Sequence, residues 1–143
     1  AALNAAIDRY GPRHGDGGNA SGRTDYRIGF TWAEQGHGAS CEVTDVKVQF
    51  TVDVTLPRLA TEAARSPAMR AEWRRFVAVL RVHEAGHAHI AYNHIDEVKA
   101  AVAASRCGEE RLRGREALDR IDRLQADYDR RTDGGERQGN IVI

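Results

Sequence analysis

The chain lacks most of the features that would assign it to a specialised class. Aromatic residues make up 6% of its 143 residues, and there are only two cysteines, three prolines and one methionine. The 21 basic and 21 acidic residues cancel, so the charge balance gives no reason to expect binding to nucleic acid or to a membrane surface. The length favours a single soluble globular domain over residues 1–143.

Long apolar runs are also missing. None of them is long enough to span a bilayer. From Ala1 onwards there is no charged segment followed by an apolar stretch, so no signal peptide is visible, and any such peptide would have been removed already.

The two cysteines, Cys41 and Cys107, lie far apart and outside any Cys-x-x-Cys spacing. This argues against a redox pair or a zinc knuckle. A disulfide between them is favoured over the alternative of two buried thiols. It would place the protein in the periplasm or outside the cell, because disulfides persist in oxidising compartments.

Two stretches alternate between apolar and polar residues, as strands with one buried face do. The first runs from Thr24 to about Glu34, and the second runs from Cys41 to Leu56, where Pro57 ends it. We expect an antiparallel sheet of two to four strands. A short helix is expected before them, at residues 2–9.

Helical spacing dominates the rest of the chain. Ser66 and Pro67 are typical of a helix start, and apolar residues at steps of three and four continue the helix to about Ala104. A second helix is expected after Gly108, ended by Gly134-Gly135, with a loose tail or a short strand at residues 141–143. The expected fold class is α+β, with a small antiparallel sheet packed against the long helix and a second C-terminal helix.

The long helix contains His83-Glu84-Ala85-Gly86-His87, an H-E-x-x-H sequence. Two imidazoles four positions apart lie one above the other on a helix and can take adjacent corners of a tetrahedral zinc ion. The carboxylate of Glu84 begins close to the same face, so it can act as general base toward water. We therefore predict Zn2+ as cofactor, His83 and His87 as metal ligands and Glu84 as the catalytic residue.

The histidines could also have structural roles. His83 and His87 could be buried rings that only bond carbonyl groups, but the carboxylate between them would then be buried without a cation, which is costly. His89 points away from the apolar stripe and should be solvated. His94 lies about 10 Å along a straight helix from His87, so we expect it to be structural or to support a ligand.

An ordered set of motifs resembles the DUF922 family of bacterial proteins, described as secreted zinc-dependent proteases with a zincin-like domain. The resemblance covers nearly the whole chain, and it implies an α+β peptidase fold acting on a peptide or protein substrate. The motifs are Gly11-Pro12, Thr24-Asp25-Tyr26, Cys41, Leu56-Pro57, Trp73, His83 to His87, Cys107, and the closing stretch from Tyr128-Asp129 through Thr132 to Gln138.

One departure from the family pattern concerns the metal. This chain has Gly134 where the closing motif has a histidine that would be the natural third zinc ligand. Either Asp133, Glu136 or His94 replaces it, or the site binds zinc weakly, or the position has been altered. Two functions follow: a zinc-dependent peptidase, or a catalytically impaired or non-enzymatic binding module of the same fold. Peptide bonds of the cell wall are a further substrate class that the same residues could serve.

Overall fold

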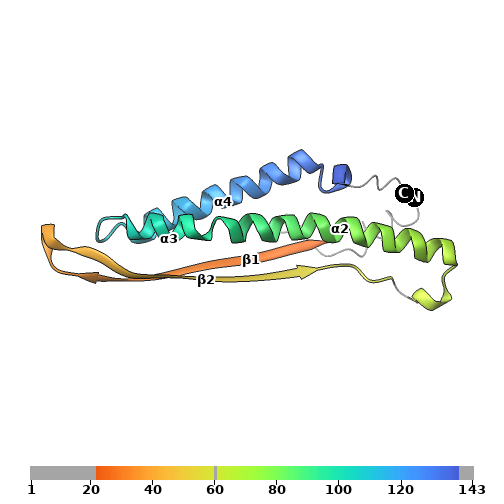
Figure 1. Ribbon diagram of the computed structural model, residues 1–143, viewed down its shortest axis with the longest axis horizontal. Helices are drawn as coiled ribbons and strands as arrows, with labels where there is room; N and C mark the ends of the chain where they lie inside the picture. The colour runs from red at the N-terminus through yellow and green to blue at the C-terminus, as the bar shows by residue number, and fades with distance from the viewer. Residues whose placement is uncertain (1–21, 60, 139–143) are drawn as a thin grey trace. The chain divides into compact units, whose positions relative to one another are not determined.

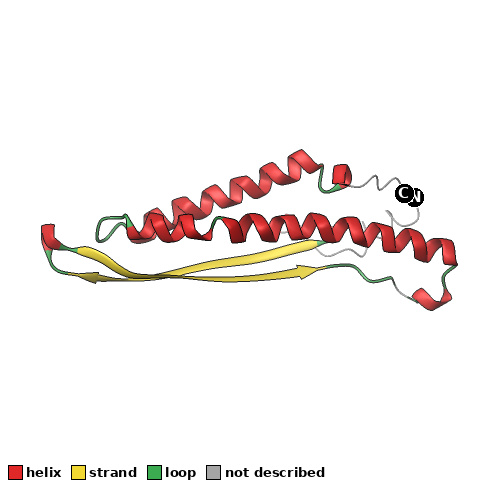
Figure 2. Cartoon of the chain, in the orientation of Figure 1, coloured by secondary structure: helices red, strands yellow, loops and turns green. Residues whose placement is uncertain are grey.

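The computed structural model describes residues 22–59 and 61–138, and Figure 1 shows their elements. The strands β1 (Arg23–Gln35) and β2 (Glu42–Thr55) form a two-stranded antiparallel sheet. The α-helices are α2 (Pro67–Asn93), α3 (Ile95–Ala103) and α4 (Glu110–Thr132). Short 3-10 turns lie at Gly38–Ser40, Glu62–Ala64 and Glu136–Gln138. Figure 2 shows that helix and strand occupy separate stretches of the chain, so the predicted α+β class is confirmed. The helix expected at residues 2–9 and the strand at 141–143 fall outside the described residues.

The long helix differs from its expected form, because it is broken at His94. α2 ends at Asn93, and α3 begins at Ile95. His94 Nδ1 lies 2.8 Å from the carbonyl oxygen of Ile90, while the backbone N–H of His94 donates to the Ala91 carbonyl at 3.3 Å. The ring thus bonds to the Ile90 carbonyl oxygen, which would accept the His94 N–H in a continuous helix. This gives His94 a structural role.

The described chain divides into two compact units. The first contains residues 22–25, 53–59, 61–87 and 129–138, and the second contains residues 26–52 and 88–128. In the first unit, the buried core is formed by Trp73, Phe76 and Leu80 of α2, at the spacing the sequence predicted. The partly buried Leu56, Leu59 and Val77 pack against it.

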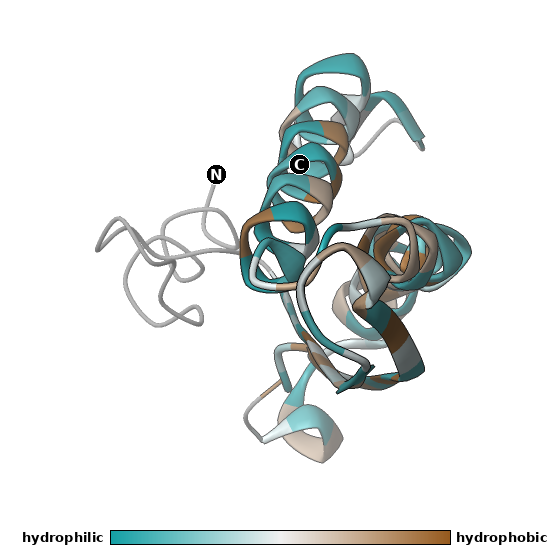
Figure 3. Ribbon diagram, turned by 90° about the vertical axis from the view of Figure 1, so that its left-hand side faces the viewer, coloured by the Kyte–Doolittle hydropathy of each residue, from teal (hydrophilic) through white to brown (hydrophobic). Residues whose placement is uncertain are grey.

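The second unit has its own core, built from three helices and both strands. Its buried residues are Ala91, Val98, Ala117 and Ile121, and the partly buried residues around them are Tyr26, Ile28, Phe30, Phe50, Ala101 and Leu118. The ribbon of each helix changes between hydrophilic and hydrophobic colours along its turns (Figure 3), as expected of helices with one buried stripe. No helix in the described stretches is both long and apolar enough to cross a membrane.

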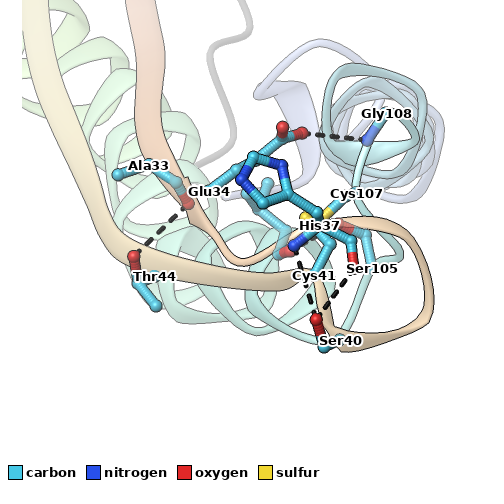
Figure 4. The surroundings of a disulfide bond; sticks show 10 residues. Ala33, Glu34, His37, Ser40, Cys41, Thr44, Ser105, Cys107 and Gly108 are labelled. Atoms are coloured by element: carbon cyan, nitrogen blue, oxygen red, sulfur yellow. Dashed lines mark hydrogen bonds between the residues drawn. A yellow bond between two sulfur atoms is a disulfide. The ribbon is translucent and has the colours of Figure 1, made fainter.

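A disulfide joins Cys41 to Cys107 in the second unit (Figure 4). The sulfur atoms are 2.00 Å apart and the Cα atoms 6.2 Å apart, distances that fit a disulfide without movement of the backbone. The prediction of a disulfide is confirmed, and the alternative of two buried thiols is excluded. The bond ties the start of β2 to the loop before α4.

Candidate metal centre

The H-E-x-x-H residues lie in the first unit, on the part of α2 that follows its apolar stripe. His83 and Glu84 are each only 4% exposed, and His87 is partly buried. They lie three, four and seven residues after Leu80. The face of α2 that carries the core residues of the first unit therefore also carries the two imidazoles. His89 is exposed, as its position on the helix predicted.

The two histidine rings converge. Their Nε2 atoms are 3.2 Å apart, and the ring planes lie at 85° with centroids separated by 4.8 Å. Both rings therefore present the same nitrogen to one point in space. The four-residue spacing predicted this approach.

A third donor comes from the last turn of α4. Asp129 Oδ1 lies 2.9 Å from His87 Nε2 and 3.2 Å from His83 Nε2. Zinc bonds of about 2.0–2.1 Å at tetrahedral angles place ligand atoms roughly 3.3 Å apart. The triangle formed by the three atoms has sides close to this value, so the three residues fit a metal ion that they hold together.

Sequence reasoning missed Asp129. Of the expected replacements for the third ligand, Asp133 is exposed, and the side chain of Glu136 lies outside the described residues. His94 is not among the clustered donors, and its Nδ1 lies 2.8 Å from the Ile90 carbonyl oxygen. The only signal was the Tyr-Asp pair that opens the closing motif. Among residues 22–59 and 61–138, two groups bring three potential ligands together, and the other one contains the disulfide cysteines, which cannot bind a metal as thiolates.

Glu84 is held beside this cluster and is not one of its ligands. Its Oε2 accepts a hydrogen bond from Thr24 Oγ1 at 2.5 Å, and the same hydroxyl lies 3.0 Å from the Glu84 carbonyl oxygen. A side chain at position 22 would place its Cβ 2.8 Å from Glu84 Oε1. Gly22 therefore leaves room beside the second carboxylate oxygen, and Thr24 fixes the first.

The fold and the cluster define an α+β protein in which two helix-borne histidines and an aspartate from a second helix could hold a metal ion. Residues 1–136 match the family DUF922, described as bacterial protein of unknown function. The chain belongs to this family. No curated protein and no solved structure is significantly similar to the chain. This description assigns no activity, so the zinc-dependent protease that the resemblance implied stays a prediction, and the function is argued from the site.

Proposed function

We propose that the protein is a zinc-dependent peptidase whose metal ligands are His83, His87 and Asp129. The observation that supports this most strongly is the triangle of donor atoms, with sides of 2.9 to 3.2 Å. Two imidazoles and one carboxylate are the donor types of catalytic zinc sites, which keep one position open. A bound zinc ion would supply a Lewis acid for a peptide carbonyl and would lower the pKa of a coordinated water.

Glu84 is the general base in this proposal. Glu84 is buried and follows His83 directly in α2, and the hydrogen bond from Thr24 to Oε2 fixes its orientation. The second oxygen, Oε1, is then the atom that accepts a proton from the attacking water and passes it to the leaving amine. Gly22 is compatible with this role because a Cβ at that position would lie only 2.8 Å from Oε1.

The substrate is a peptide or protein in an extended conformation. Among residues 22–59 and 61–138 the sheet has two strands, so each strand has one outer edge there, and edges of this kind can bind extended chains through main-chain hydrogen bonds. The disulfide supports a periplasmic or secreted location. Peptides of the cell wall would be available there alongside proteins.

The activity is tested by hydrolysis of an unstructured protein with the wild-type chain and with Glu84→Gln. The substitution keeps the shape of the side chain but removes its basicity, so the rate should fall by roughly 100-fold or more while the zinc content stays the same. Hydrolysis that survives the substitution would rule out Glu84 as the base.

A non-enzymatic or impaired binding module is the second candidate, and Gly134 is the observation that favours it. A Cβ at this position would meet nothing within 4 Å, so there is space for the histidine of the family pattern, although the φ of 59° strains any residue with a side chain. Zinc content of the wild type and of Gly134→His should be compared side by side. Because Asp129 supplies a third donor, the peptidase proposal expects stoichiometric zinc in both, whereas a large gain in the variant would support an incomplete site.

A further inference from the structure

The second ring nitrogen of His83 has a partner of its own. His83 Nδ1 lies 2.8 Å from Gln138 Oε1, and Thr132 Oγ1 lies 3.4 Å from the same nitrogen. An amide oxygen only accepts hydrogen bonds, so this contact is a hydrogen bond in the tautomer of His83 that carries its proton on Nδ1. The lone pair of the neutral ring is then on Nε2, the atom that faces His87 and Asp129.

The way α4 ends brings Gln138 to this place. Asp133, Gly134 and Gly135 have φ values of 53°, 59° and 99°, which reverse the chain after the helix. The Gly134 N–H donates to the Asp129 carbonyl at 2.9 Å, and the Gln138 N–H donates to the Gly135 carbonyl at 3.0 Å. One segment of ten residues therefore supplies a carboxylate to Nε2 of His83 and an amide oxygen to Nδ1 of the same ring.

We propose that Gln138 is a positioning residue of the metal centre, which selects the His83 tautomer with Nε2 available for the ion and fixes the orientation of the ring. This inference rests on the metal ligands of the proposed function, not on the peptidase activity. Partners of this kind raise the basicity of a ligating histidine, and their loss typically weakens metal binding 10- to 100-fold.

The test measures zinc affinity by competition with a chromophoric chelator. Gln138→Leu removes the acceptor and should weaken zinc binding by roughly 10- to 100-fold. Gln138→Glu keeps an acceptor and adds charge, so its affinity should equal or exceed that of the wild type. Gln35→Leu is the matched control, because Gln35 is an exposed glutamine at the end of β1 in the second unit, and its affinity should not change.

Each outcome decides the inference. Unchanged zinc affinity in Gln138→Leu would overturn the inference. An equal loss of zinc affinity in Gln138→Leu and Gln138→Glu would also overturn it, because that result would indicate that the Gln138 side chain contributes packing alone. Gln138→Ala replaces the leucine variant if circular dichroism shows that the latter does not fold. A wild type that binds no zinc would overturn both this inference and the metal centre. If the zinc affinities follow the expected order but the protein hydrolyses no substrate, only the peptidase proposal is overturned.

Discussion

At the scale of single residues, Gly135 shapes the candidate centre because it has no side chain. Its φ of 99° is one that residues with a Cβ rarely adopt, and a Cβ there would lie 3.0 Å from Cγ of His83. The neighbouring Gly134 also has a positive φ, 59°, but an added Cβ would meet nothing within 4 Å. The two glycines therefore form a matched pair in which only Gly135 is packed against His83.

We predict that Gly135→Ala destabilises the protein more than Gly134→Ala does. The left-handed conformation costs roughly 1–2 kcal/mol at either position, and only Gly135→Ala adds a clash with His83. Urea unfolding of the metal-free chains measures the difference, and zinc affinity should fall in Gly135→Ala alone. Equal stability losses with unchanged zinc binding would show that the glycine does not support the ring.

Residue spacing alone predicted the meeting of His83 with His87, since both lie on one helix. It could not predict Asp129, which is 42 positions beyond His87 on another helix. Its place depends on where the last turn of α4 lies. Aspartate is also common in that helix, so residue type did not distinguish this position. By contrast, the lack of a side chain at Gly134 can be seen in the sequence itself.

At the scale of elements, an acid pair joins the end of β1 to the first turn of α4. Glu110 is 2% exposed, and its Oε1 has no hydrogen-bond partner among the described side chains, whereas Glu34 Oε1 accepts the Gly108 N–H at 3.1 Å (Figure 4). The hydrogen bond with Glu110 raises the pKa of Glu34. Burial works to raise the pKa of Glu110, but hydrogen bonds from its own N–H, from Glu34 and from Gly108 lower it overall. When the pair holds a single proton, these opposite directions favour its position on Glu34 over Glu110.

The shared proton predicts a stability maximum in mild acid. The contribution of Glu34, whose pKa is raised in the folded protein, is present at low pH and is lost as pH rises through that pKa. The contribution of Glu110, whose pKa is lowered, is present at higher pH and is lost as pH falls through its own value. The acid pair therefore contributes most to stability at pH values between the pKa of Glu110 and the pKa of Glu34 in the folded protein.

Glu34→Gln should flatten this dependence, because the amide can donate to Glu110 at every pH. Unfolding midpoints measured from pH 4 to pH 8, roughly the range in which perturbed carboxyl groups titrate, provide the check. Glu42→Gln, an exposed position at the start of β2, is the control and should leave the profile unchanged. A wild-type profile without a fall toward neutral pH, or one that Glu34→Gln leaves intact, would contradict the shared proton.

The periodicity of apolar residues predicted both strands and the buried faces of the helices. It did not predict which residues of an apolar face are covered by other parts of the protein. Val52 and Val54 continue the apolar side of β2 and are nevertheless 38% and 44% exposed. Alternation indicates which residues share a face, while burial depends on what packs against it. The break at His94 was missed for a similar reason, because a ring that bonds a carbonyl leaves no mark in the apolar pattern.

At the scale of the whole molecule, the disulfide closes a loop between cysteines 66 positions apart. In the chain-entropy account, a loop of this length restricts the unfolded chain enough to stabilise the fold by about 4 kcal/mol. The double variant Cys41→Ser, Cys107→Ser should lose most of this free energy of unfolding in urea denaturation. A loss below roughly 1 kcal/mol would mean that the unfolded chain is already constrained without the bond.

The most direct test of the central proposal is the zinc content of the purified chain, measured by mass spectrometry after dialysis. A three-ligand site predicts about one zinc ion per wild-type chain and its loss in Asp129→Ala. Asp133→Ala, which removes an exposed carboxylate four residues further on, should keep the metal. A wild type without zinc, or an Asp129→Ala chain that binds zinc as fully as Asp133→Ala does, would contradict the proposed centre.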